Sequence, residues 1–226
     1  MQIQCAILFS GNGSNMQNLI ESLHNKHFIH AQTHKDCKLH IALTLCNNAN
    51  AHGITRTKNL NIPCAVLPHR DFSSREEFDK QMIATLQTYR IEYVILAGFM
   101  RILTPLFTNT FRTINIHPSF LPEHKGANAI KDSFYAKQSY GGVSVHWVNE
   151  ELDGGEIILQ EKIEKIQGES LEGFESRIHA LEYILYPKAI LKALHLLPKE
   201  SSVKSCIESH SQPSTESAIE SSKEKQ

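Results

Sequence analysis

The chain of 226 residues lacks an excess of charge of either sign and is poor in cysteine. Lys and Arg together number 23, and Asp and Glu 24, which leaves a net charge of −1. Broad binding of nucleic acid or of an anionic membrane needs clustered Lys and Arg, so this balance argues against both partners. The five cysteines are odd in number and form no Cys-x-x-Cys pair. This favours free thiols in a reducing compartment over disulfides or a zinc site.

Long apolar segments are also missing. The longest apolar stretch, near residues 94–100, is far shorter than the roughly 20 residues that cross a bilayer. The first residues, 1–5, carry none of the positive side chains that a secretory signal peptide has there. We therefore expect a cytoplasmic protein without a membrane partner.

The chain does contain enough apolar sequence for a sizeable core, because 41% of its residues are hydrophobic. Short apolar runs alternate with segments of helical period, and the runs expected to form buried strands are 3–9, 41–46, 64–67, 93–97 and 113–116. Helices are expected over 14–25 and from Ser74, which forms a capping-box pattern with Glu77. Strands that alternate with helices predict an α/β fold: a Rossmann-like, mostly parallel twisted sheet with helices on both faces.

The second half is expected to hold a helix over 128–136, two strands over 142–148 and 156–163, and a long helix from Leu171. We therefore expect one α/β domain over residues 1–198. Residues 199–226 hold nine Ser, four Lys and five Glu and no aromatic residue, so they cannot bury enough apolar surface to offset chain entropy. They are predicted to form a disordered tail.

Residues 10–15, Ser-Gly-Asn-Gly-Ser-Asn, follow the first predicted strand and open a helix. Glycines allow a sharp turn, and amide N–H groups at a helix N-terminus attract anions. Met16 stands where the dinucleotide fingerprint needs its third glycine, and no Lys-Ser or Lys-Thr pair completes a Walker motif. The segment suits a single phosphate better than NAD or ATP. A plain strand–helix turn capped by Ser14 explains it equally well.

Asn115 and His117 lie two residues apart at the end of a predicted strand, so both side chains point to one side of the sheet edge where open α/β folds bind ligands. Asn can donate to an oxyanion, and His can move a proton near neutral pH. The alternative is a structural histidine at a capped strand end. Asp153 precedes Gly154 and Gly155, which is typical of a turn, and it matters chemically only beside a cation such as a protonated histidine.

Four of the 13 histidines are spaced so that they could share a helical face: His24, His27, His30 and His34. The polar residues around them indicate a solvated helix end and loop, so we expect no metal site. Residues 97–103 follow another strand and either line a slot for a flat heterocycle or simply lead into a helix.

Together these segments resemble the glycinamide ribonucleotide formyltransferase (phosphoribosylglycinamide formyltransferase) family, folate-dependent enzymes of de novo purine (IMP) synthesis. The likeness covers about residues 3–187 and is carried by residues 10–15, 74–76, 96–103, 115–119, 144–146 and 151–155. Residues 125–129 depart from the Pro-Gly-x-His stretch of that family, so no role is assigned to them.

The resemblance implies transfer of a formyl group from 10-formyltetrahydrofolate to the amine of glycinamide ribonucleotide, without a metal. The catalytic trio that it implies is Asn115, His117 and Asp153, and the substrate-binding residues are Gly13, Ser14, Asn15 and Glu182. The folate-binding residues that it implies are Arg75, Met100, Arg101, Ile102, Leu103, Asn115, Asn149, Glu150, Glu151, Leu152 and Asp153. The expected partners are small molecules, and the expected state is a monomer or weak homodimer.

Other functions fit parts of the pattern. Formyltetrahydrofolate hydrolase uses water as the acceptor but carries an extra N-terminal domain, for which a first strand at Ile3 leaves no room. The related methionyl-tRNA enzyme needs a basic C-terminal domain, whereas residues 199–226 are acidic by one charge. A phospho-ligand-binding module without catalysis is the remaining alternative, and it needs no reactive histidine.

Overall fold

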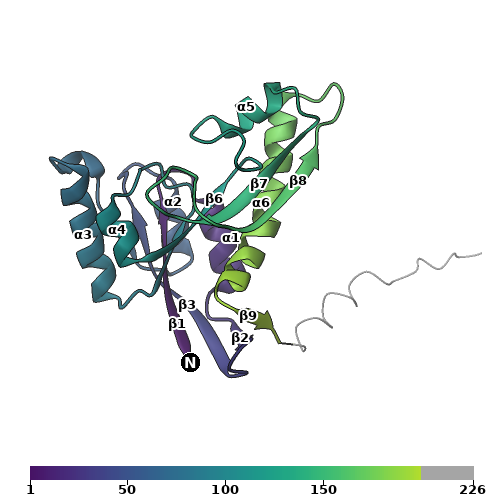
Figure 1. Cartoon of the computed structure of the whole chain (residues 1–226). Helices are drawn as coiled ribbons and strands as arrows, with labels where there is room; N and C mark the ends of the chain where they lie inside the picture. Colours follow the sequence, from purple (N-terminus) through teal and green to yellow (C-terminus); the bar gives the residue numbers. More distant parts are fainter. Residues whose placement is uncertain (200–226) are drawn as a thin grey trace, which may run out of the picture.

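Strands and helices alternate along residues 1–199, the part of the chain that this computed structural model describes (Figure 1). The elements in chain order are β1 (Gln2–Phe9), α1 (Ser14–Leu23), β2 (His27–His30), β3 (Asp36–Cys46), α2 (Gly53–Asn59), β4 (Cys64–Val66), the 3-10 helix η1 (His69–Asp71), α3 (Arg75–Thr88), β5 (Tyr93–Leu96), α4 (Pro105–Thr110), β6 (Arg112–His117), α5 (Ala129–Tyr135), β7 (Tyr140–Trp147), β8 (Ile157–Glu164), α6 (Leu171–Ala193) and β9 (Leu196–Pro198).

The described strands form one sheet in the order β8-β7-β6-β5-β1-β3-β2-β9, with β4 paired to β3. Its middle is parallel, because β1 pairs in parallel with β3 and β5, β5 with β6, and β3 with β4. The pairs toward both edges are antiparallel. Among the strands of residues 1–199, only β2 and β7 run against the others. The prediction of a mostly parallel sheet is therefore confirmed.

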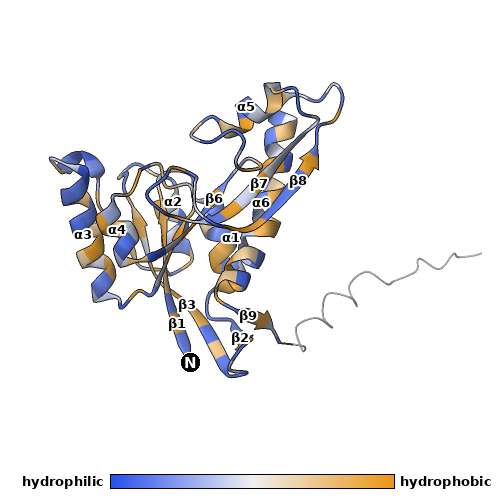
Figure 2. Ribbon diagram, in the orientation of Figure 1, coloured by the Kyte–Doolittle hydropathy of each residue, from blue (hydrophilic) through white to orange (hydrophobic). Residues whose placement is uncertain are grey.

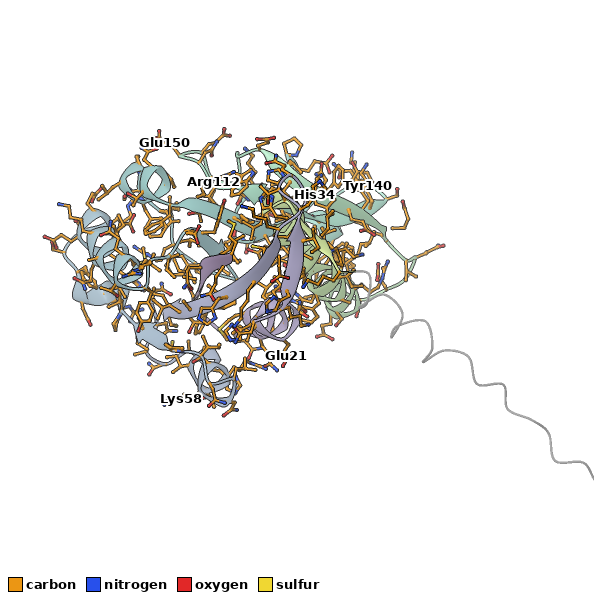
Figure 3. The ribbon with its side chains drawn as sticks, turned by 90° about the horizontal axis from the view of Figure 1, so that it is seen from below. Glu21, His34, Lys58, Arg112, Tyr140 and Glu150 are labelled. Carbon is orange, nitrogen blue, oxygen red and sulfur yellow. The ribbon has the colours of Figure 1, made fainter. Side chains whose placement is uncertain are left out.

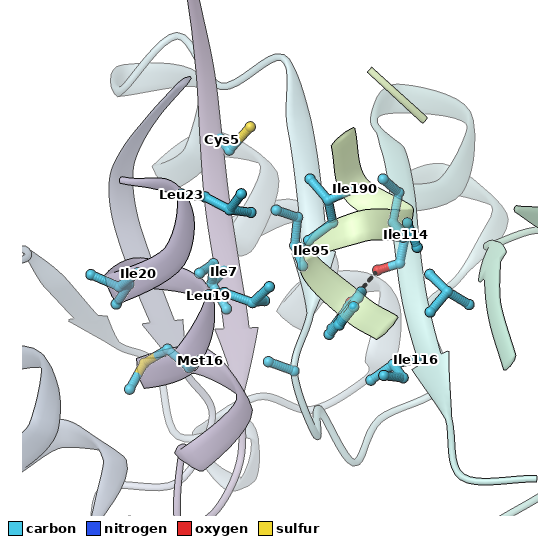
Figure 4. Close-up of a cluster of buried hydrophobic side chains, with 14 of the residues drawn as sticks. Cys5, Ile7, Met16, Leu19, Ile20, Leu23, Ile95, Ile114, Ile116 and Ile190 are labelled. Carbon is cyan, nitrogen blue, oxygen red and sulfur yellow. Dashed lines mark hydrogen bonds between the residues drawn. The ribbon is translucent and has the colours of Figure 1, made fainter. Parts of the chain in front are cut away.

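Helices cover both faces of the sheet because the central strands are apolar on both sides. Ile7 of β1 packs into a core with α1 and α6, whereas the next residue, Leu8, packs with α3 and α4. Figure 2 shows this apolar character along the central strands. Figure 4 shows the first of the two cores, where Leu19 of α1 and Ile190 of α6 lie over the sheet.

The long helix α6 is tied to the middle of the sheet by Tyr186. Its fully buried hydroxyl donates to the carbonyl oxygens of Leu96, at 2.8 Å, and of Ile114, at 3.3 Å. The Leu96 carbonyl is at the carboxyl end of β5 and the Ile114 carbonyl is in the middle of β6, so the helix holds together the two strands that lead to the candidate site.

Several elements differ from the sequence predictions. The interpretation of the histidine segment as helix end and loop is wrong for His27–His30, which form β2 between β3 and β9. Helix α2 and strand β9 were not expected, because each is short, whereas α4 follows residues 97–103, for which a lead into a helix was one of the two interpretations. The capping box at α3 is formed only in part. Ser74 accepts from the N–H of Glu77, but the Glu77 carboxylate accepts from Ser73.

The predicted tail, apart from Lys199, lies outside the described residues. None of the helices described within residues 1–199 has the length and apolar character needed to cross a membrane.

Candidate active site

Three loops meet at the carboxyl ends of β1, β5 and β6. Ser10, directly after β1, donates its N–H to the carbonyl of Gly98 at 3.0 Å. Its hydroxyl accepts from the N–H of Met100 at 2.7 Å. These bonds join the glycine-rich loop to the loop after β5, and β6 ends beside β5 at His117. The sheet edge therefore collects segments that are far apart in the sequence.

His117 and Asp153 form a buried pair at this edge. The Nδ1 of His117 lies 3.4 Å from the Oδ2 of Asp153, and each side chain is only 6% exposed. The Nε2 of His117 donates to the carbonyl of His124 at 2.9 Å. Both ring nitrogens thus face acceptors, and only the protonated ring has an N–H for each of them. Asp153 therefore has a histidine partner, which was the condition for it to have a chemical role.

His146 contacts two members of the predicted trio, Asn115 and Asp153. It lies opposite Asn115 in the β6–β7 ladder. Its Nδ1 donates to the carbonyl of Trp147 at 2.8 Å, which leaves Nε2 to accept from the Nδ2 of Asn115 at 3.3 Å. The same Nε2 lies 3.7 Å from the Oδ1 of Asp153. His146 thereby fixes which way the Asn115 amide faces and leaves that amide a second N–H for a ligand.

The loop of Asp153 is bent sharply back onto β6 and β7. Asp153 has a left-handed φ of 50°, and an added Cβ at Gly155 would lie 1.7 Å from a carbonyl oxygen of β7, so glycine is required there. Burial raises the pKa of Asp153. The hydrogen bond from the Gly126 N–H and the positive charge of a protonated His117 favour the ionised carboxylate, and the pKa of Asp153 lies below the ordinary 3.8.

The glycine-rich loop contacts α6. Gly13 has a φ of 75°, and an added Cβ would lie 2.9 Å from the Cα of Gly53. Asn15 donates its Nδ2–H to the buried Glu182 at 3.0 Å, and its own Oδ1 is buried without a partner in residues 1–199. Glu182 also accepts from the Nδ1 of His179 at 2.8 Å, and this bond is the main cause of a pKa for His179 above its ordinary value.

Arg56, in α2, supports the same loop from the other side. Its Nε and Nη2 donate to the backbone and side-chain oxygens of Asn12, at 2.9 and 3.1 Å, and its Nη1 donates to Gln17 at 2.5 Å. Asn12 and Gln17 lie on either side of Ser14, the first residue of α1, so Arg56 braces the start of this helix. Residues 10–17 contain no Lys or Arg, so Arg56 supplies a positive charge that the loop itself lacks.

The apolar part of the implied folate site lies at the same edge. Met100, Ile102 and Leu152 expose 70%, 52% and 50% of their surface, although each is a large hydrophobic residue. Leu103, in contrast, is buried, in a cluster against which Val148 packs. The loop after β5 and the end of β7 therefore share one core, and exposed apolar side chains stand above it.

The polar residues of that implied site are less tightly joined. Arg101 has a buried Nε without a partner in the described part of the chain. Arg75 is the exposed first residue of α3 and has no hydrogen bond or ion pair to the other implied folate residues within residues 1–199. Asn149 accepts from the N–H of Glu151 at 3.0 Å, and Glu150 points outward at the edge of the molecule (Figure 3).

Sequence reasoning missed two residues of this site. His146 was noted only as part of a family segment, although its position two residues after Ser144 in a predicted strand places both side chains on one face. Arg56 gave no signal at all, because it lies 44 positions from Asn12 in a helix that was not predicted. No group of three or more His, Cys, Asp or Glu within residues 1–199 is arranged to hold a metal ion.

Comparison with known proteins confirms the family resemblance. A family model described as formyl transferase matches residues 3–190. The phosphoribosylglycinamide formyltransferase of Haemophilus influenzae is 38% identical over 187 residues, covering 82% of this chain and 84% of the relative. That of Escherichia coli is 36% identical over 186 residues, covering 81% and 84%. The crystal structure of phosphoribosylglycinamide formyltransferase from Campylobacter jejuni superposes with a TM-score of 0.79 at 44% identity, covering 85% of this chain and 98% of that one. The chain therefore belongs to the formyl transferase family, in the group of the phosphoribosylglycinamide formyltransferases.

Proposed function

We propose that this chain transfers the formyl group of 10-formyltetrahydrofolate to the amine of glycinamide ribonucleotide, giving formylglycinamide ribonucleotide and tetrahydrofolate. The observation that carries the proposal is the buried contact of His117 with Asp153, beside Asn115, at the sheet edge that also holds the glycine-rich loop. Glycinamide ribonucleotide has a phosphate at one end and an amine at the other, so it can place the phosphate on the glycine-rich loop and the amine near His117. The names of the relatives support the same reaction.

In the proposed reaction the amine nitrogen forms a bond to the formyl carbon, and the electrons of the C=O bond move onto its oxygen. Asn115 donates its free Nδ2–H to that oxyanion. Protonated His117 donates its Nε2–H, which also faces the carbonyl of His124, to the same oxyanion. Donors held in a buried site ahead of the reaction are commonly its largest catalytic contribution, and one such donor is worth about 10²–10³ in kcat.

Two proton movements complete the transfer. One proton leaves the attacking nitrogen, and one reaches the folate nitrogen as its bond to the formyl carbon breaks. His117 moves the proton, directly or through water, because imidazole is the side chain suited to proton transfer in enzymes. Asp153 stabilises the protonated ring between these steps, since an ionised carboxylate at this distance favours a positive charge.

The substrate phosphate binds to the amide N–H groups of Gly13, Ser14 and Asn15, where the start of α1 adds positive potential. Arg56 holds this loop in shape and offsets part of the phosphate charge. Glu182, which accepts a hydrogen bond from the Asn15 side chain, also accepts one from a ribose hydroxyl of the substrate.

The folate lies against the loop after β5 and under the loop that follows β7. Met100, Ile102 and Leu152 supply exposed apolar surface for its flat ring. The residues proposed to contact the folate are Arg75, Met100, Arg101, Ile102, Leu103, Asn115, Asn149, Glu150, Glu151, Leu152 and Asp153.

The test is an absorbance assay of tetrahydrofolate release from 10-formyltetrahydrofolate, with and without glycinamide ribonucleotide. We expect release only when the amine substrate is present. We also expect His117→Ala to abolish release while the protein stays folded, and the exposed His34→Ala to serve as an unaffected control. Release without the amine would instead indicate the hydrolase. Release by neither route, or full turnover in His117→Ala, would refute the proposal.

We also propose a cytoplasmic location, which the cysteine spacing supports, and a monomer or weak homodimer as the working state. Sedimentation velocity over a range of concentrations measures that state directly.

A further inference from the structure

Two backbone groups of the loop after β6 contact the catalytic pair. The carbonyl of His124 accepts from the Nε2 of His117 at 2.9 Å. The N–H of Gly126 donates to the Oδ2 of Asp153, also at 2.9 Å. The carbonyl therefore lies against the histidine, which donates a hydrogen bond, and the N–H lies against the aspartate, which accepts one. Residues 125 and 126 belong to the stretch 125–129, to which the sequence assigned no role.

Lys125, which lies between His124 and Gly126, adds a side-chain contact to the loop that holds Asp153. Lys125 donates its Nζ–H to the Oε1 of Glu151 at 2.7 Å, and Glu151 lies two residues before Asp153. The Glu151 side chain packs closely on the bend, because an added Cβ at Gly154 would lie 2.4 Å from its carboxyl carbon. The side chains of the pair are 33% and 67% exposed, so salt screens their attraction.

The loop is itself fixed to the sheet just before these contacts. The hydroxyl of Ser144, in β7, donates to the carbonyl of Ser119 at 2.8 Å and accepts from the N–H of Leu121 at 3.0 Å. Gln160, in β8, donates to the carbonyl of Leu121 at 3.1 Å. Residues 124–126 therefore reach the catalytic pair from a support anchored on two strands.

We propose that residues 124–126 are a positioning segment for the transfer: the His124 carbonyl and the Gly126 N–H set the His117 ring and the Asp153 carboxylate against each other, and the lysine between them ties down the aspartate loop. The inference rests on the proposed function, because it states how the pair is aligned for that reaction. A misplacement of about 1 Å in a catalytic group can cost about 10²-fold in rate, so a small shift of this backbone is enough to be measured.

Gly126 offers a substitution that acts on the backbone alone. Its φ is 90°, a backbone conformation that residues with a side chain rarely adopt, yet nothing lies within 4 Å of an added Cβ. Gly126→Ala therefore strains the chain and turns its N–H without creating a clash. Lys125→Met removes the ion pair and keeps the length of the side chain, and Lys125→Arg keeps the charge.

The experiment compares these variants in the tetrahydrofolate-release assay. We expect Gly126→Ala to lower kcat by about tenfold or more and Lys125→Met to lower it by about two- to fivefold, with both KM values unchanged. We expect Lys125→Arg to restore kcat. Lys131→Met is the matched control, because Lys131 is an exposed lysine of α5 with no ion pair within residues 1–199.

A second readout separates positioning from a general loss of structure. The groups that face Asp153 are His117 from β6, His146 from β7 and the N–H of Gly126. Turning that N–H away weakens one of the interactions that lower the pKa of Asp153, so the acidic limb of the kcat profile moves to higher pH in Gly126→Ala. Nitrogen NMR of the His117 ring in the unliganded protein reports the same change without any turnover.

The inference is overturned if Gly126→Ala keeps kcat within about twofold of the unmodified protein and leaves the ring nitrogen shifts of His117 unchanged. It is also overturned if the variants raise KM while kcat stays constant, which would make the segment a binding element. Its failure is distinguishable from failure of the proposed function. An unmodified protein that does not respond to glycinamide ribonucleotide refutes the function, while the NMR comparison still tests the alignment of the pair.

Discussion

Replacing Asp153 with Asn removes the negative charge from the catalytic pair and changes little else in shape. Unit charges 3.4 Å apart attract by about 5 kcal/mol at an effective dielectric constant of about 20. Water screens this pair poorly because each side chain is only 6% exposed. Burial of the carboxylate offsets part of the attraction, which leaves about 3 kcal/mol for the protonated ring. We therefore expect Asp153→Asn to lower kcat by about 100-fold.

Tetrahydrofolate release at saturating concentrations of both substrates measures this loss, and thermal unfolding checks that the variant stays folded. Asp132→Asn is the matched control, because Asp132 is an exposed carboxylate in α5 outside the site. A kcat for Asp153→Asn within about threefold of the unmodified protein would show that the carboxylate does not support the charge on His117. The proposed mechanism would then lose its account of what stabilises the positive charge that forms on that ring during the transfer.

Three further predictions concern the glycine-rich loop and the core. Arg56→Gln is expected to raise the KM for glycinamide ribonucleotide by about tenfold without changing the KM for the folate, whereas Lys58→Gln on the same helix changes neither in steady-state kinetics. Tyr186→Phe removes the hydroxyl that joins α6 to β5 and β6 and is expected to lower the free energy of unfolding by about 1–2 kcal/mol in urea denaturation. NMR titration should give His179 a pKa above 6.5 because Glu182 accepts from its ring, and Glu182→Gln should lower it. Since the pKa of His179 is raised in the folded state, its contribution to stability is complete below about pH 6.5 and is lost as pH rises through the raised value.

The central strands were predictable because their cause is local. β1 and β5 are buried on both faces of the sheet, and their sequences are apolar over consecutive residues, as in Ile7 and Leu8. β2 and β9 were not predicted, since they depend on pairing with each other across most of the chain, as Ile29 does with Leu197. Strands of three or four residues are too short to show a periodicity that distinguishes them from a loop.

The candidate site divides in the same way. The spacing of Asn115 and His117 places both on one side of a strand end, and the family resemblance adds Asp153 to them. Neither argument shows that the aspartate reaches the histidine, because that contact depends on how the loop after β7 bends.

The sequence by itself determined the fold class, the two-residue spacing of the amide and the imidazole, and the glycines that let two loops turn. The tertiary structure alone decided that Asp153 lies 3.4 Å from His117, that Arg56 supports the glycine-rich loop and that Gly126 directs its N–H at the aspartate. The reason is physical. Local patterns follow from the periodicity of a strand or helix, whereas contacts between distant segments follow from the packing of the sheet and loops around them.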